Sequence, residues 1–90
     1  MVLYMRTIIN EPIKVRIDID SVSNKAHLLC VKWQGRSYLV HEVGIKYTNR
    51  VGRTFIHVFS VNVGTLDMRI QVDGETLHAT LVEISDGLAD

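Results

Sequence analysis

Residues 13–20 read Ile-Lys-Val-Arg-Ile-Asp-Ile-Asp, with an apolar side chain at every odd position and a charged one at every even position. Successive side chains of a β-strand point to opposite faces of a sheet, so this alternation predicts a strand with one buried and one solvated face. No segment of the chain keeps apolar residues at helical spacing over ten or more positions. We therefore expect a chain built from strands, with little or no helix.

A first hairpin follows in the sequence. An apolar run at residues 27–33 precedes a second β-prone run at residues 36–43, and the dipeptide Gln34-Gly35 separates them. Two residues of this kind between strands are typical of a tight turn. The aromatic residues on either side of the turn, Trp33 and Tyr38, are expected to pair across the hairpin.

The C-terminal half predicts further strands. Residues 54–63 are dense in Val, Ile, Phe and Thr, which favours a central strand. Residues 66–72 alternate between apolar and polar side chains, and Asp73-Gly74 leads from them into a second hairpin partner at residues 76–84. About six strands without intervening helices predict an all-β domain, a small antiparallel barrel or roll. Closure of the sheet, or pairing with a second copy, is expected to cover its apolar face.

The composition fits a single globular domain spanning residues 1–90. Of the 90 residues, 47% are hydrophobic and 22% are charged, which excludes a disordered chain, and the length excludes two domains. A domain of this size has a modest core and little room for an enclosed catalytic pocket. We expect no cofactor. Residues 1–10 are predicted either to pair as an edge strand or to stay flexible.

Several features favour the cytoplasm. Cys30 is the single cysteine, so it cannot form an internal disulfide, and its apolar sequence neighbours predict a buried, unreactive thiol. The apolar run at residues 1–5 is too short for a signal peptide. No run approaches the roughly 20 apolar residues that a membrane-spanning helix needs. We therefore expect a cytoplasmic protein that makes no contact with a membrane.

Charge is unevenly distributed, although ten cationic and ten acidic residues balance overall. Residues 25–53 contain six Lys or Arg against one Glu, a net charge of +5. Residues 54–90 contain one Arg against six acidic residues, a net charge of −5. Such a separation can mark a phosphate-binding or protein-binding surface, or two halves that neutralise each other across the sheet.

The basic segment contains the candidate binding residues. Residues 44–53 are polar and include two glycines, which predicts the longest loop of the chain. Three cations and an aromatic residue in this stretch are candidates to contact a nucleic acid or a partner: Lys46, Tyr47, Arg50 and Arg53. Cations can bind a phosphate backbone, and an aromatic ring can stack on a base. An ordinary solvated loop or a dimer contact explains the same residues.

Metal binding and catalysis have little support in the sequence. The four histidines, His27, His41, His57 and His78, fall one to each predicted strand and lack the short spacing of metal-ligand motifs. We therefore expect no metal site. No pattern marks a nucleophile together with its base, so no enzyme is expected. A small enzyme whose site is built across strands is the least favoured alternative.

Residues 33–43, Trp-Gln-Gly-Arg-Ser-Tyr-Leu-Val-His-Glu-Val, resemble the W-x-G-R-x-Y-x-V-x-E-V core of a family of small uncharacterised bacterial β domains. Tyr47, Arg53, Thr54 and Val58 lie about where that family continues, and the similarity extends over roughly residues 26–84. The family often has a tryptophan in its last strand, where this chain has Ala79. The resemblance implies a bacterial β domain and names no activity or catalytic residue.

Together these observations favour a non-catalytic binding or protein-interaction module that self-associates, with a homodimer as the expected form. The principal alternative is a nucleic-acid-binding β-barrel that uses the basic segment 25–53.

Overall fold

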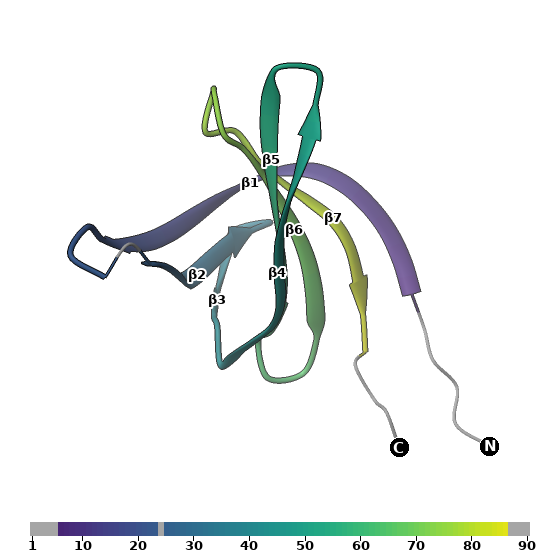
Figure 1. Cartoon of the computed structure of the whole chain (residues 1–90). Coiled ribbons are helices and arrows are strands. Elements are labelled where there is room, and N and C mark those ends of the chain that lie inside the picture. The colour runs from purple at the N-terminus through teal and green to yellow at the C-terminus, as the bar shows by residue number, and fades with distance from the viewer. Residues whose placement is uncertain (1–5, 24, 87–90) are drawn as a thin grey trace.

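A computed structural model describes residues 6–23 and 25–86, which form one antiparallel sheet of seven strands (Figure 1). The strands in chain order are β1 (Arg6–Asp20), β2 (Lys25–Trp33), β3 (Arg36–Leu39), β4 (Glu42–Val51), β5 (Thr54–Asn62), β6 (Asp67–Asp73) and β7 (Ala79–Ser85). Their order across the sheet is β3-β2-β1-β7-β6-β5-β4. The described residues contain no helix, so the expected all-β fold is confirmed.

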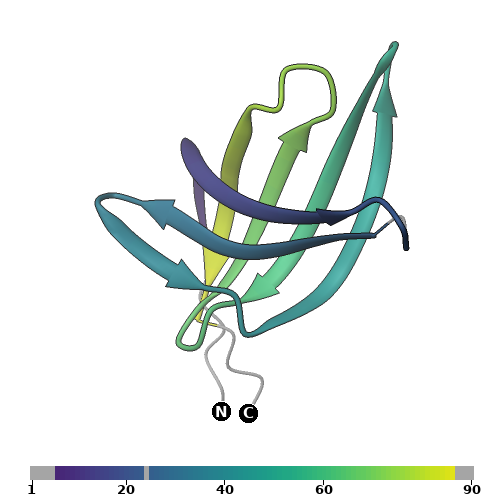
Figure 2. The same cartoon turned by 90° about the vertical axis from the view of Figure 1, so that its left-hand side faces the viewer.

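The sheet curls because β1 is long and bent. Its first part pairs with β7 and its second part pairs with β2. The register of β1 is irregular at two points, between Ile8 and Glu11 and between Arg16 and Ile17, and Asn10 at the first point has a φ of 52°. Such irregularities are β-bulges, which bend a strand and increase its twist. As a result, the end of β1 and the whole of β2 pass across the concave side of β4–β7 (Figure 2). The molecule is a curled half-barrel.

The hydrophobic core fills this concave side. The largest fully buried side chains among the described residues are Met68, Ile70, Leu81, Val31, Val58 and Val61. All of these except Val58 belong to one core cluster, whose members here come from β2, β5, β6 and β7. Apolar residues of β1, including Ile13, Val15 and Ile17, pack against the cluster as the alternation predicts. Burial of this apolar surface is the main stabilising contribution to such a fold.

The half-barrel is not closed by a ladder between its two edge strands. The chain passes directly from β3 to β4: the Val40 N–H donates to the Leu29 carbonyl oxygen at 2.9 Å, and the His41 N–H donates to the Asn62 carbonyl oxygen at 2.8 Å. Beyond this corner the described strands β3 and β4 each have a single neighbour. The predicted closure is therefore only partial.

The first predicted hairpin is confirmed, with one correction. Gln34 and Gly35 have φ values of 52° and 76°, the two positive values that a type I′ turn requires. The rings of Trp33 and Tyr38 lie on the same face with centroids 6.3 Å apart. The predicted strand at residues 36–43 is wrong beyond Leu39, because the chain turns the corner at residues 40–41 and Glu42 already belongs to β4.

The second predicted hairpin is confirmed as β6 and β7, with a longer connection than expected. Asp73 organises this connection, since its Oδ1 accepts hydrogen bonds from the N–H groups of Glu75 at 2.8 Å and Thr76 at 3.0 Å. The bond from Thr76 is the main reason why the pKa of Asp73 lies below its ordinary value. β7 begins at Ala79 and not at residue 76, because residues 74–78 form the turn.

The N-terminal segment is a strand where the structure describes it. Residues 6–10 open β1 and pair with β7, while residues 1–5 lie outside the described residues. Cys30 lies within β2 as expected but is only half-buried, so the prediction of a fully buried thiol is wrong. No helix in the described part of the chain is long and apolar enough to cross a membrane.

Candidate functional site

β4 is the most exposed strand of the sheet. All ten of its residues are exposed, and β5 is its only neighbour among the described strands. In Figure 1 the β4–β5 hairpin stands out from the rest of the molecule. A long edge strand presents a row of backbone groups that can pair with another chain. This edge is therefore a candidate interaction site.

The predicted loop at residues 44–53 is wrong, because these residues form most of β4 and the turn that follows. Gly44 lies at a bulge in the ladder, and Gly52, with a φ of 62°, occupies the first position of the two-residue turn between β4 and β5. Glycine is favoured at that position in hairpin turns of type II′. The glycines that suggested a loop therefore mark a bulge and a tight turn.

The structure separates the candidate binding residues onto different faces. Lys46 and Arg50 lie opposite Phe59 and Phe55 and share the concave face. Tyr47 lies opposite Val58, on the convex face, since side chains alternate along a strand. Arg53 sits in the turn. Lys46 and Arg50 therefore share one face of β4, and Tyr47 lies on the opposite face.

Both concave-face cations lie over aromatic rings. Lys46 Nζ is 5.9 Å from the centroid of the Phe59 ring, and Arg50 Cζ is 5.9 Å from that of Phe55. Phe59 is buried in the core, whereas 51% of the surface of Phe55 is exposed. Attraction to the ring face keeps each cation close to the strand. The edge thus carries two positive charges held in defined positions.

Each cation also has a hydrogen-bond acceptor within the chain. Lys46 Nζ donates to the carbonyl oxygen of Ala26 in β2 at 3.3 Å, which links two elements distant in the sheet order. Arg50 Nε donates to the Gly52 carbonyl oxygen at 3.1 Å. Both bonds are exposed to solvent and involve neutral acceptors. An anionic acceptor would compete with them, because hydrogen bonds between two ionised groups are stronger.

The direction of the free backbone groups on β4 follows from the hairpin register. In a two-residue hairpin the residues that flank the turn, here Val51 and Thr54, form a hydrogen-bonded pair, and such pairs alternate along the ladder. The next pair, Arg50 with Phe55, is therefore not hydrogen-bonded. The Phe55 carbonyl oxygen accepts from the Gly74 N–H at 2.7 Å, on the side away from β4, as this alternation requires.

The same alternation continues along the edge. The N–H and C=O groups of Lys46, Thr48 and Arg50 point away from β5, toward the open side of β4. Thr48 stands between the two cations on the concave face, where its Oγ1 lies 3.1 Å from Nδ1 of His57. A strand that pairs with this edge would form its backbone hydrogen bonds with the N–H and C=O groups of Lys46, Thr48 and Arg50. Its concave-face side chains would lie opposite Lys46 and Arg50.

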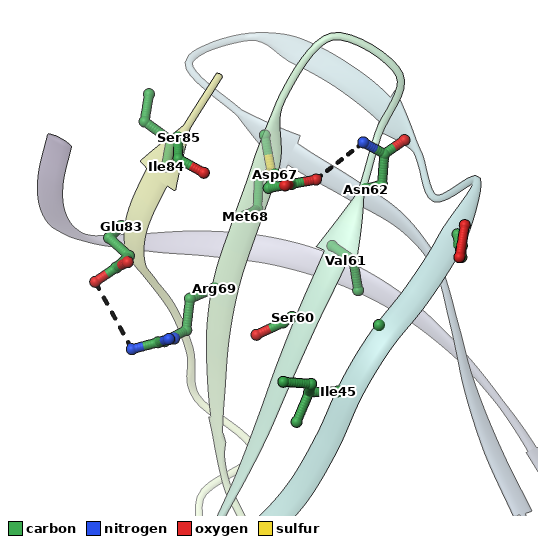
Figure 3. A pocket seen from close by; sticks show the side chains of 12 residues that line it. Ile45, Ser60, Val61, Asn62, Asp67, Met68, Arg69, Glu83, Ile84 and Ser85 are labelled. Carbon is green, nitrogen blue, oxygen red and sulfur yellow. Dashed lines mark hydrogen bonds and ion pairs between the residues drawn. The ribbon is translucent and has the colours of Figure 1, made fainter. Parts of the chain in front are cut away.

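The convex face carries a shallow depression next to the start of β4. Its volume is about 400 Å³, and its lining includes Ile45, Ser60, Asp67, Arg69 and Glu83 (Figure 3). Asp67 accepts a hydrogen bond from Asn62 at 2.9 Å, drawn as a dashed line. No motif or spacing in the sequence predicts the set of residues that line this depression, because they come together only through the register of β4–β7.

Glu83 is the centre of the charged group on this face. Its Oε2 lies 3.1 Å from Arg6 Nε, and its Oε1 lies 3.8 Å from Arg69 Nη1. Only 12% of the Glu83 side chain is exposed. The buried Nε of Arg69 has no hydrogen-bond partner among the described residues. Glu83 pairs with both Arg6 and Arg69, so these charges are accounted for by ion pairs within the fold.

The four histidines belong to different parts of the fold. His27 is in β2, His41 lies between β3 and β4, His57 is in β5 and His78 precedes β7. In the described ranges no group of three or more His, Cys, Asp or Glu side chains is placed to hold a metal ion. In the ladder, His57 lies opposite Thr48 on one side and Val72 on the other.

No protein-family model, curated protein or solved structure matches this chain. The resemblance of residues 33–43 to a bacterial family therefore stays a prediction.

Proposed function

We propose that the protein is a non-catalytic interaction module that binds an extended segment of another protein along β4. The observation that carries this proposal is the exposure of all ten residues of β4, a strand that has β5 as its only neighbour among the described strands. Addition of a strand to an open sheet edge is a common mode of peptide recognition, in which main-chain hydrogen bonds supply affinity and alternate side chains supply specificity.

The convex face of β4 supports the same proposal. Ile45, Tyr47 and Val51 are all exposed there. An apolar edge of this kind invites pairing with another strand unless charges or bulges prevent it. A docked strand would cover part of this apolar surface while its backbone pairs with the edge.

Nucleic-acid binding has less support than strand docking. The placement of Tyr47 on the face opposite Lys46 and Arg50 removes the combination of stacking and phosphate contact that motivated it. It remains the alternative, and labelled oligonucleotides titrated over a salt series test it directly.

The test of strand docking uses a labelled ten-residue peptide with the β4 sequence in which Gln replaces both cations, titrated with the full chain by fluorescence anisotropy. Thr48→Pro removes the central outward N–H, which an edge strand tolerates because that N–H has no partner in the sheet. Thr48→Val keeps the N–H and changes only the hydroxyl, which a methyl group replaces, so it is the matched control.

We expect the peptide to bind wild type and T48V with similar affinity and T48P at least about tenfold more weakly. Circular dichroism checks that T48P keeps its strands. Equal binding to T48P and T48V, or no binding of any ten-residue strand peptide, would contradict docking at β4.

A further inference from the structure

The side chains at the free edge of β4 determine which strand can pair with it. Residues directly opposite in an antiparallel pair interact, so opposite charges stabilise the pair and like charges destabilise it. On the concave face the sequence of the edge is Lys46, Thr48, Arg50, and the two cations are held over aromatic rings. A partner strand therefore meets positive charge at two points four residues apart.

A second copy of this chain is a poor partner for this edge. If Thr48 faces Thr48 of another copy in a two-fold pair, Lys46 faces Arg50 in both halves of the pair. A two-fold axis at Lys46 or at Arg50 sets two identical cations directly opposite each other. An axis at Tyr47 or Asn49 leaves like charges diagonal to each other, still within reach of long side chains.

The rest of the edge is well suited to strand pairing. In the Thr48-centred register the convex faces match Ile45 with Val51 and Tyr47 with Asn49. Two apolar contacts would form on that face, so charge is the main obstacle to this pair. Inward-pointing charges on an edge strand are a known device against edge-to-edge association.

We propose that the natural partner of β4 is an extended segment with two carboxylate side chains four residues apart, which lie opposite Lys46 and Arg50. This inference rests on strand docking at β4 and adds the chemistry of the docked strand. The middle residue between the two acids lies opposite Thr48 and is small or polar. The residues at the positions in between point to the convex face, like Ile45 and Tyr47, and are apolar. The carboxylates replace neutral acceptors, the Ala26 and Gly52 carbonyl oxygens, with ionised ones.

The experiment compares four labelled peptides based on the β4 sequence. The acidic peptide is Glu-Val-Gly-Ile-Glu-Tyr-Thr-Asn-Glu-Val, in which Glu replaces both cations. The control of identical composition, Glu-Val-Gly-Glu-Ile-Tyr-Thr-Glu-Asn-Val, moves the same two Glu residues to the other face. The third peptide carries Gln in place of both cations, and the fourth keeps the native Lys and Arg. Each is titrated with wild-type protein by anisotropy at low and high salt.

We expect the acidic peptide to bind about tenfold more tightly than the control of identical composition, and the native-sequence peptide to bind most weakly. The advantage should shrink at high salt, because exposed charge pairs are screened. In the K46E/R50E double variant the order should reverse, with the native-sequence peptide bound best. Both positions are exposed, so this variant is expected to fold.

The outcomes separate this inference from the proposed function. If all four peptides bind equally to wild type and all lose binding to T48P, strand docking holds and the acidic partner is wrong. If the acidic peptide and its composition control bind equally while the others do not, attraction is non-specific and the acidic-strand inference is overturned. If no peptide distinguishes T48P from T48V, both proposals fail.

Discussion

The ammonium group of Lys46 on the edge strand β4 lies 3.3 Å from the carbonyl oxygen of Ala26 at the start of β2. β2 and β4 lie toward opposite ends of the sheet, so this hydrogen bond crosses the open side of the half-barrel. It links the hairpin of β1 and β2 to the edge that we propose as the docking site. An arriving carboxylate would compete for the same ammonium group.

Replacement of Lys46 tests the strength of this link. We expect K46M to lower the free energy of unfolding by no more than about 1 kcal/mol, because an exposed hydrogen bond contributes little net stability. Urea denaturation should show a lower midpoint with an unchanged slope. K46R, which can still donate, is the control. Greater stability in K46M than in wild type would show that the bond does not hold the two elements together.

The core makes a larger contribution. Leu81 is fully buried among β6, β7 and the strands that cross them, so L81A should cost about 2 to 5 kcal/mol through lost burial and the cavity left behind. L39A removes the same atoms from an exposed position on the edge strand β3 and should change stability by less than about 0.5 kcal/mol. Chemical denaturation of both variants measures the difference, and equal losses would be incompatible with this core.

The turn before β7 contains a removable strain. Leu77 has a φ of 63°, which is unfavourable for a residue other than glycine, and 74% of its surface is exposed. Packing of its side chain therefore offsets little of the backbone strain. Glycine adopts this conformation without the steric cost. We expect L77G to raise the free energy of unfolding by about 1 kcal/mol, measured by thermal denaturation. A lower melting temperature in L77G would mean that the side chain contributes packing that outweighs the strain.

Stability should fall in acid in part through Asp73. Its pKa is lowered in the folded state, mainly by the hydrogen bond from the Thr76 N–H, so its contribution is complete above its ordinary pKa of 3.8 and is lost as the pH falls through the lower folded value. D73A should therefore be less stable than wild type at neutral pH and should approach it in strong acid. D73N keeps an acceptor oxygen without the charge, so its deficit at neutral pH should be smaller. It should also shrink in acid, because only wild type titrates at this position. Melting temperatures from pH 7 to about pH 2 test this.

Much of the fold could be predicted from local patterns. The alternation at residues 13–20 and the turn at Gln34-Gly35 identify β-structure because one face of each strand is buried. The sequence does not predict β4, because this strand buries neither face and because Gly44, Asn49 and Gly52 are residues typical of loops. A weaker strand signal is present, since apolar side chains recur at positions 43, 45, 47 and 51.

The candidate site was only partly predictable. Lys46 and Arg50 were identified by their charge, and the structure places both on one face of the same strand. Their separation from Tyr47 could not be foreseen, because a segment interpreted as a loop has no defined faces. The importance of Thr48 depends on the hairpin register and on which backbone groups β5 leaves free. The grouping of Arg6, Arg69 and Glu83 depends on the pairing of three strands, which no local pattern specifies.

Amide hydrogen exchange at Thr48, followed by NMR with and without the acidic peptide, is the decisive test of strand docking at β4. In the free protein the Thr48 N–H should exchange quickly and those of Tyr47 and Asn49 more slowly, because only the latter two face β5. Saturation with the peptide should slow exchange at Lys46, Thr48 and Arg50 and leave Tyr47 and Asn49 nearly unchanged. Exchange at Thr48 that stays fast in the saturated complex would show that the partner does not pair with this edge.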